Sequence, residues 1–399
     1  MLEPRIASQE GFEGYLALAL LLPRLTSYRR RPLSVEQDYL DTEPVSWSVR
    51  ATRLPDGDRP VDLWVDDAGR FAAGPQPGAE RLPGRFVAPG LVDAHAHPAV
   101  TMTDSGPAAL ASADALDILA GWAASGVCLV RDTGSPGGSA LRLDLAAGMP
   151  RLQAAGRFLA PAGRYFPALL PDEVPQEQLT NLALAELAHG SRWVKLIADF
   201  PPVVDGMPAG PAAPTYSLDA IEAMITAVHR AGGRVAAHTT TDLVAALVRA
   251  GVDSVEHGTG LDESALRLMA RTGAAWTPTL CAVLGISATA SEAARQRAGA
   301  YRERLRDLLP LAHRLGVPIL TGTDAAGSVV REIGLLAEHG LEPAAALGAA
   351  TTAGYQFLGE QYDEAGELAT LVTYDADPRE DLAALSAPAA VVIDGVRVR

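Results

Sequence analysis

Six side chains in this sequence are of types that bind metal ions or transfer protons, and each follows or ends a short apolar run. They are His95, His97, Lys195, His238, His257 and Asp324. Imidazole binds zinc, iron, nickel and cobalt, and a carboxylate serves either as a ligand or as a base. The set therefore predicts a metal site whose ligands come from several separate strands.

The four histidines of this set form two pairs. His95 and His97 are two positions apart, and side chains at such positions of a strand share one face, so both imidazoles can reach one ion. His238 and His257 each end an apolar run, with one predicted helix between them, and are therefore expected to close adjacent strands. Taken singly, each histidine could instead be a core residue satisfied by the backbone; the repeated placement favours a site.

Lys195 and Asp324 each allow two interpretations. A lysine inside the apolar strand 193–197 is costly because burial destabilises the ammonium and lowers its pKa. It either reaches the end of the strand and pairs with a carboxylate such as Asp199, or is neutral enough to react with carbon dioxide. The resulting carbamate could bridge two metal ions. Asp324 could cap a following helix, or bind a metal and exchange protons with water.

Strand and helix signals alternate from residue 86 to about residue 352. The predicted strands are 86–94, 127–132, 157–160, 193–197, 234–237, 254–256, 274–277 and 318–321. The predicted helices are 108–125, 176–188, 218–231, 241–250, 263–272 and 290–315. This pattern predicts an α/β fold, a (β/α)8 TIM barrel, with a doubly wound sheet as the alternative. Candidate ligands at the carboxyl ends of several different strands favour the barrel.

Four segments are predicted along the chain. Residues 1–45 form an N-terminal extension, and 87–365 form the barrel. Residues 46–86 and 366–399 are read as the two parts of a small β-sandwich, because each carries short alternating strands whose apolar faces need partners. The Asp394-Gly395 pair predicts a hairpin in the second part.

Composition restricts the partners and the compartment. A net charge of −15 argues against nucleic-acid or anionic membrane partners, so a small-molecule substrate is expected, with a homo-oligomer possible. The two cysteines, Cys128 and Cys281, give no disulfide framework, which favours a reducing compartment. The apolar run 16–22 is too short to span a bilayer and lacks the pattern of a signal peptide. We therefore expect a cytoplasmic protein.

Six stretches carry a family resemblance: APGLVDAHAH (88–97), VRDTG (130–134), WVK (193–195), VAAH (235–238), VEHG (255–258) and LTGTD (320–324). With these the chain resembles the amidohydrolase superfamily over residues 46–399, most closely its prolidase-like and imidazolonepropionase-related branch. The set is specific for the superfamily and weakly specific for the substrate. The segments 196–202 and 325–330 depart from the usual pattern, and both are expected to face the substrate.

The resemblance implies a barrel with a β-sandwich and two divalent metal ions, with zinc expected. Carboxylated Lys195 and a hydroxide would bridge the two ions. His95, His97 and Asp324 would hold the more buried ion, and His238 and His257 the other. Tyr216 resembles a tyrosine that contacts the substrate carboxylate in prolidase-like members.

The expected activity is metal-dependent hydrolysis of an amide C–N bond in a peptide-like or N-acyl amino acid substrate. Metal-bound hydroxide would attack the carbonyl, and Asp324 would act as general acid and base. One alternative is a mononuclear enzyme that hydrolyses a cyclic amide or an imidazolone. A second is a non-catalytic metal-binding scaffold, because fold does not determine function.

Overall fold

The computed structural model describes residues 45–399 apart from 104–105, 286–291 and 363–364. The predicted N-terminal extension and its apolar run 16–22 therefore lie outside the described residues, except for Val45. None of the helices in the described part of the chain is long and apolar enough to cross a membrane. The cytoplasmic location and the homo-oligomer stay predictions.

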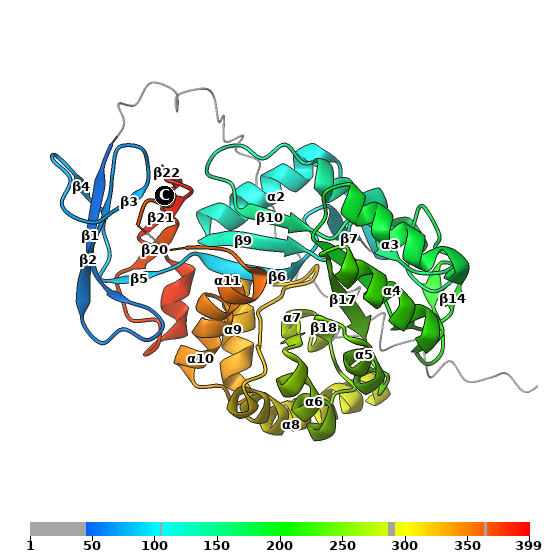
Figure 1. Ribbon diagram of the computed structural model, residues 1–399. Coiled ribbons are helices and arrows are strands. Elements are labelled where there is room, and N and C mark those ends of the chain that lie inside the picture. The colour runs from blue at the N-terminus through cyan, green and yellow to red at the C-terminus, as the bar shows by residue number, and fades with distance from the viewer. Residues whose placement is uncertain (1–44, 104–105, 286–291, 363–364) are drawn as a thin grey trace, which may run out of the picture.

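Strands from both ends of the chain form one eight-stranded sheet (Figure 1). Its strands are β1 (Trp47–Arg53), β2 (Pro60–Val65), β3 (Phe71–Ala72), β4 (Glu80–Arg81), β5 (Phe86–Ala88), β20 (Leu371–Tyr374), β21 (Ala390–Ile393) and β22 (Val396–Arg397). The order is β22-β21-β20-β5-β1-β2-β3, with β4 paired to β1. Alternate residues of β1, namely Trp47, Val49 and Ala51, are buried with Leu371 and Val392. The division into a separate β-sandwich domain stays a prediction.

The second group of strands is parallel and carries the predicted ligands. It comprises β6 (Leu91–Ala96), β9 (Val127–Asp132), β10 (Arg151–Ala154), β11 (Phe158–Leu159), β12 (Trp193–Ile197), β17 (Arg234–Thr239), β18 (Ser254–His257) and β19 (Ala275–Thr277). The strands pair in the orders β10-β9-β6 and β11-β12-β17-β18-β19. Every residue of β9 and β12 is buried, as expected for parallel strands covered on both faces.

The parallel sheet curls so that its last strand approaches its first. Ile319 forms a parallel bridge with Trp276 of β19, and the N–H of Ala94 in β6 donates to Thr321 O at 2.8 Å. The predicted strand 318–321 is thus present only as these bridging contacts rather than as a regular strand. The α/β class is confirmed, and the curled sheet is consistent with a TIM-barrel-like fold.

The third predicted strand, 157–160, differs from the structure. The chain bends at Gly156, so β10 pairs with β9 while β11 pairs with β12. Gly156 has φ 76°, and a Cβ there would lie 2.1 Å from Glu186 Oε2. Glu186 instead accepts the N–H of Arg157 at 3.1 Å. The predicted strand therefore corresponds only to β11, and β10, on the other side of the bend, was not predicted.

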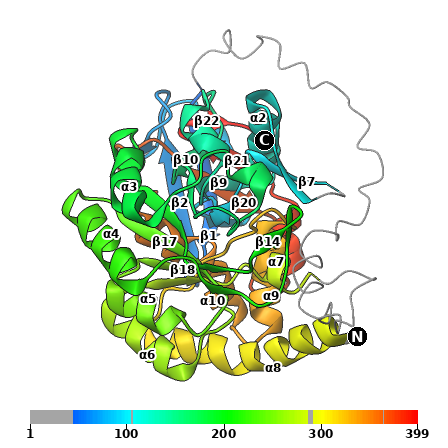
Figure 2. The same ribbon diagram turned by 90° about the vertical axis from the view of Figure 1, so that its right-hand side faces the viewer.

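Helices lie between most of the parallel strands and cover the outside of the sheet (Figures 1 and 2). They are α2 (Ser112–Ala124), α3 (Leu179–Ala188), α4 (Leu218–Arg230), α5 (Val244–Ala250), α6 (Glu263–Thr272) and α8 (Glu292–Leu315). Four further helices were not predicted from the sequence: α7 (Leu280–Val283), α9 (Val329–Glu338), α10 (Pro343–Ala349) and α11 (Thr352–Leu358). Side-chain caps fix three of these helix starts: Ser217 Oγ accepts from Ala220 N, Asp262 Oδ1 from Ala265 N, and Ser328 Oγ from Arg331 N.

Three small antiparallel ribbons follow strand ends near the predicted site. Their strands are β7 (Val100–Thr103) with β8 (Gly106–Ala109), β13 (Asp199–Phe200) with β16 (Ala213–Pro214), and β14 (Val203–Val204) with β15 (Met207–Pro208). The predicted helix 108–125 begins only at Ser112, because β8 occupies the preceding residues.

Candidate active site

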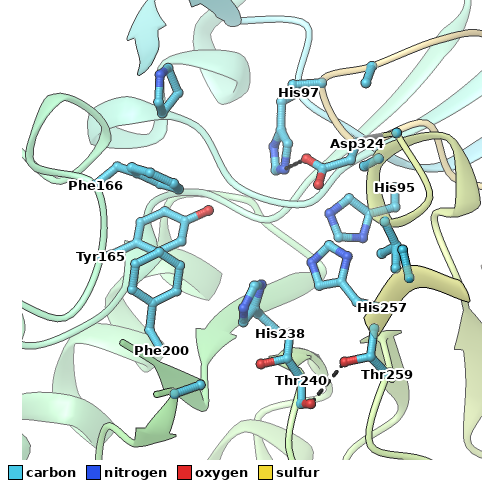
Figure 3. A pocket seen from close by; sticks show the side chains of 18 of the residues that line it. His95, His97, Tyr165, Phe166, Phe200, His238, Thr240, His257, Thr259 and Asp324 are labelled. Atoms are coloured by element: carbon cyan, nitrogen blue, oxygen red, sulfur yellow. Dashed lines mark hydrogen bonds and ion pairs between the residues drawn. The ribbon is translucent and has the colours of Figure 1, made fainter. Parts of the chain in front are cut away.

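The structure brings all six predicted metal-site residues to the wall of one cavity of about 720 Å³ (Figure 3). His95 lies in β6 and His97 directly follows it, Lys195 lies in β12, and His238 and His257 lie near the ends of β17 and β18. Asp324 forms a parallel bridge with Ala96, which places it beside His95 and His97. The cavity therefore lies at the carboxyl ends of the parallel strands.

Short distances join the site residues. His95, His257 and Asp324 each offer a ligand atom, and these atoms all lie within 4.8 Å of one another. His97 Nε2 is 3.3 Å from Asp324 Oδ1. The ring centroids of His238 and His257 are 4.5 Å apart, so His238 continues the same cluster. This spacing fits a group of ligands that share one or two cations.

Three of the four histidines have their Nδ1 atoms engaged by oxygen acceptors. The partners are Glu256 Oε2 at 2.6 Å for His95, Gly134 O at 2.8 Å for His97, and Thr279 Oγ1 at 2.7 Å for His257. The Thr279 hydroxyl donates to Pro278 O, so it accepts from His257. Each Nδ1 therefore carries a hydrogen, which leaves Nε2 as the ligand atom.

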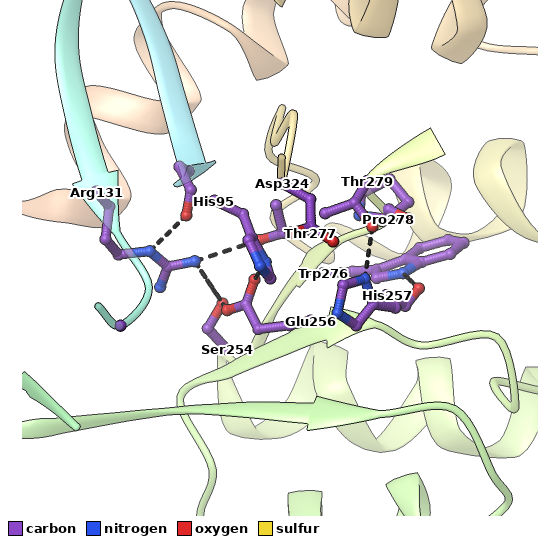
Figure 4. Close-up of polar contacts among 12 residues, drawn as sticks. His95, Arg131, Ser254, Glu256, His257, Trp276, Thr277, Pro278, Thr279 and Asp324 are labelled. Atoms are coloured by element: carbon purple, nitrogen blue, oxygen red, sulfur yellow. Dashed lines mark hydrogen bonds and ion pairs between the residues drawn. The ribbon is translucent and has the colours of Figure 1, made fainter. Parts of the chain in front are cut away.

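A buried network of ion pairs and hydrogen bonds, centred on Glu256, contacts the His95 ring (Figure 4). Glu256 Oε1 accepts from Arg131 Nη2 at 2.8 Å and from Ser254 Oγ at 2.6 Å. The Arg131 guanidinium also lies 4.4 Å from the ring centroid of Trp193. Burial alone would raise the pKa of Glu256, but Arg131 and His95 hold it well below its usual range. Glu256 is therefore an anion that fixes the orientation of the His95 ring.

Replacing Glu256 with glutamine is expected to weaken metal binding by about 10-fold to 100-fold, as is typical when the partner of a ligating histidine is changed. The glutamine keeps the size of the side chain but removes the charge that orients His95. Competition with a coloured chelator measures the affinity. Glu263→Gln is the matched control, because Glu263 is exposed and, within the described part of the chain, forms an ion pair with Arg267 alone. Equal affinity in both variants would show that the carboxylate does not support the site.

Lys195 is the only lysine in the chain, although Lys and Arg together number 33. It is buried, and among the described residues its Nζ has no hydrogen-bond partner. Burial lowers its pKa to about 8, so a substantial fraction is neutral near physiological pH. The alternative partner Asp199 instead accepts hydrogen bonds from the successive threonines Thr239, Thr240 and Thr241. The structure thus shows no pairing of Lys195 with Asp199.

Protonation of the other groups follows from burial and from nearby charges. Burial and the charge of Lys195 lower the pKa of His95 to about 3 and that of His238 to about 4, so both are neutral imidazoles. Burial would raise the pKa of Asp324, yet contacts with His97 and His95 hold it below its usual range. Against the effect of burial, Asp132 and Asp324 raise the pKa of His97 to about 9. That proton must leave before His97 can bind a metal.

Two site residues have strained backbones. His257 has φ 64° and Asp324 has φ 59°, a left-handed conformation that is uncommon for residues other than glycine. Such strain persists where the surrounding structure enforces it, and it is concentrated at functional sites. The N–H of Asp324 donates to His95 O at 2.7 Å, which fixes the turn that carries the carboxylate into the site.

The sequence profile of the Amidohydrolase family matches residues 86–398. The chain belongs to this family. It is also 33% identical to the uncharacterized protein Rv2915c of Mycobacterium tuberculosis over 366 residues, which cover 87% of this chain and 94% of the relative. The resemblance inferred from the six sequence stretches is therefore confirmed.

Solved structures share the fold of this amidohydrolase. A prolidase complexed with N-methylphosphonate-L-proline is 23% identical, with a TM-score of 0.73, over 89% of this chain and 100% of that one. A Xaa-Pro dipeptidase with methionine bound in its active site is 22% identical, with a TM-score of 0.72, over 88% and 99%. These likenesses show the fold, and membership of the Amidohydrolase family makes this chain a hydrolase that acts on carbon–nitrogen bonds.

Tyr216, the predicted substrate contact, does not line the cavity of this amidohydrolase. Its side chain lies in the main hydrophobic core, and its hydroxyl donates to Val174 O at 2.9 Å. Tyr165, Phe166 and Phe200 lie in the wall instead, with ring centroids 5.0–5.3 Å apart (Figure 3). The segments that depart from the usual family pattern do reach the cavity, through Phe200, Ala325 and Ala326.

Sequence reasoning assigned no role to Glu256, Arg131 or Thr279, although Glu256 and Arg131 lie within the family-like stretches. The available signal was a charged side chain inside an apolar strand, which rarely occurs without a partner. The contact between His95 and Glu256 joins residues 161 positions apart, so local spacing could not reveal it.

Proposed function

We propose that this hydrolase is metal-dependent and cleaves the amide bond of a peptide-like or N-acyl amino acid substrate. In this proposal the curled sheet is a (β/α)8 barrel accompanied by a small β-sandwich. Carboxylated Lys195 bridges two divalent ions, with zinc expected. The observation that carries the proposal is the engagement of Nδ1 in His95, His97 and His257, which leaves Nε2 of each ring to act as the ligand atom. The prolidase and dipeptidase names of the structural neighbours support a peptide-like substrate.

The donor set fits two divalent cations. Four imidazoles and one carboxylate line the same cavity as Lys195, and the buried atoms His238 Nε2 and Lys195 Nζ have no hydrogen-bond partners among the described residues. Bound cations and a carbamate would satisfy both atoms. His95, His97 and Asp324 would hold one ion, and His238 and His257 the other. The close group formed by His95, His257 and Asp324 takes members from both sets, so in this proposal the two ions would be neighbours.

Ions bound at this site would lower the pKa of a water molecule toward neutrality and polarise the substrate carbonyl. The residues of the chain would then perform the proton transfers. Asp324 is kept anionic by His95 and His97, so it can accept a proton from the attacking water. It would deliver that proton to the leaving nitrogen. Glu256 and Thr279 would keep the rings of His95 and His257 in the ligating orientation.

Removal of metal tests this proposal. Dialysis against a strong chelator is expected to abolish hydrolysis of a panel of dipeptides and N-acyl amino acids, and zinc with bicarbonate is expected to restore it. The buried core of the fold should persist, which circular dichroism would verify. Unchanged turnover in protein shown by mass spectrometry to hold no metal would contradict the proposal.

A mononuclear enzyme that hydrolyses a cyclic amide is the second candidate. The three-residue group His95, His257 and Asp324 is sufficient by itself for one ion, which favours this alternative. The two candidates differ in metal content and in the state of Lys195. One ion per chain and an unmodified amine would support the mononuclear enzyme.

A further inference from the structure

One wall of the cavity is formed by helix α8, and its charge is unusual for this protein. Apart from the six residues of the predicted metal centre, the charged side chains described along the cavity wall are Arg297 and Arg304. Both belong to α8. The chain carries 48 acidic residues against 33 basic ones, so an arginine-only wall does not follow from its composition. A cleft lined by one sign of charge attracts ligands of the opposite sign.

Arg297, Tyr301 and Arg304 are spaced four and three residues apart, and such residues share one face of a helix. We call these three residues the α8 face. Arg304 is fixed, because its Nη1 donates to Thr259 O at 3.2 Å and its Nη2 to Leu261 O. Arg297 is exposed and has neither a hydrogen-bond nor an ion-pair partner among the described residues. Its guanidinium is therefore available to a ligand.

Tyr301 adds an unsatisfied polar group to the same face. Its side chain lines the cavity but is only 7% exposed, and its buried hydroxyl has no hydrogen-bond partner among the described residues. The guanidinium of Arg304 lies 5.9 Å from its ring centroid. A buried hydroxyl without a hydrogen-bond partner is energetically costly. A water molecule or a bound ligand would remove that cost by forming the missing hydrogen bond.

We propose that the α8 face receives a carboxylate of the substrate and that Arg297 is the residue that selects for it. A guanidinium can bind a carboxylate through two parallel hydrogen bonds. The aromatic wall of Tyr165, Phe166 and Phe200 offers an apolar surface elsewhere in the same cavity. The preferred substrate would therefore join an apolar group to a free carboxylate through the amide bond. This inference rests on the proposed amide hydrolysis and names the class of substrate.

Paired substrates test the inference. Each pair is an apolar dipeptide or N-acyl amino acid with a free carboxylate and the same compound ending in a carboxamide. Arg297→Gln is expected to lower kcat/KM for the carboxylate substrate by about 10-fold to 100-fold, the range for a hydrogen bond to a charged group. The loss should appear in KM rather than kcat. The effect on the carboxamide substrate should be far smaller.

Arg306→Gln is the matched control, because Arg306 lies on the same helix, pairs with Glu303 at 2.6 Å and does not line the cavity. Equal losses for both members of each pair, or no loss in Arg297→Gln, would overturn the inference while leaving amide hydrolysis intact. If the wild-type protein hydrolyses neither member, the proposed function fails.

Calorimetry with N-acetyl-leucine and N-acetyl-leucinamide then tests the α8 face directly, since preferential binding of the carboxylate must disappear in Arg297→Gln. Equal binding of the two probes would overturn it.

Discussion

Asp324→Asn is expected to reduce kcat by about 100-fold to 10,000-fold, the usual contribution of a positioned general acid and base. Asparagine keeps an oxygen that can bind a metal ion, but it cannot accept the proton that Asp324 would take from water. Metal content should therefore fall much less than turnover. Steady-state kinetics and metal analysis of the same preparation measure both quantities.

Asp62→Asn is the control for this prediction, because Asp62 is exposed, does not line the cavity and, among the described residues, forms an ion pair with Arg50 alone. It should behave as the wild type. Near-normal turnover in Asp324→Asn would remove Asp324 from the proton transfer. A parallel loss of metal and turnover would instead make Asp324 chiefly a ligand.

Lys195→Ala is expected to lower the metal content from about two ions per chain to one or fewer and to abolish most of the activity. Alanine cannot form the carbamate that supplies an anionic oxygen to both ions. Loss of the second ion should be specific, because the four histidines and Asp324 remain. Metal analysis of protein purified in bicarbonate checks the stoichiometry, and circular dichroism checks the fold.

Lys195→Arg provides the matched control, because it keeps a positive charge while remaining protonated and unable to react with carbon dioxide. It should lose the second ion as alanine does. Two ions per chain in both variants would show that position 195 does not bridge them, and the mononuclear candidate would fail on the same result.

Much of the site could be predicted from sequence because side chains able to bind a metal ion occur repeatedly at the ends of predicted strands. Each histidine and Asp324 followed an apolar run, and parallel strands bring their carboxyl ends to one edge. The arginine-dominated composition also singles out Lys195, since every other basic residue among the 33 is arginine. That signal was available without any structure.

Features that depend on distant contacts could not be predicted. The bend at Gly156 packs against Glu186, thirty positions further on, and it separates β11, which the predicted strand 157–160 covers, from β10, which was not predicted. Tyr216 was expected at the substrate site from the family resemblance, yet its hydroxyl donates a hydrogen bond to Val174 O in the core. The helix predicted at 290–315 was found as α8, but periodicity did not indicate that its arginines reach the cavity.

The proposed two-ion centre depends on a carbamate at Lys195, and because this is the single lysine of the chain, the carbamate can be measured directly. Protein equilibrated with zinc and carbon-13 bicarbonate should show one carbamate carbon resonance that is absent from Lys195→Ala, which also controls for the α-amino group. That result would support two ions bridged through Lys195. A protein that holds two ions per chain without this resonance would contradict the bridge.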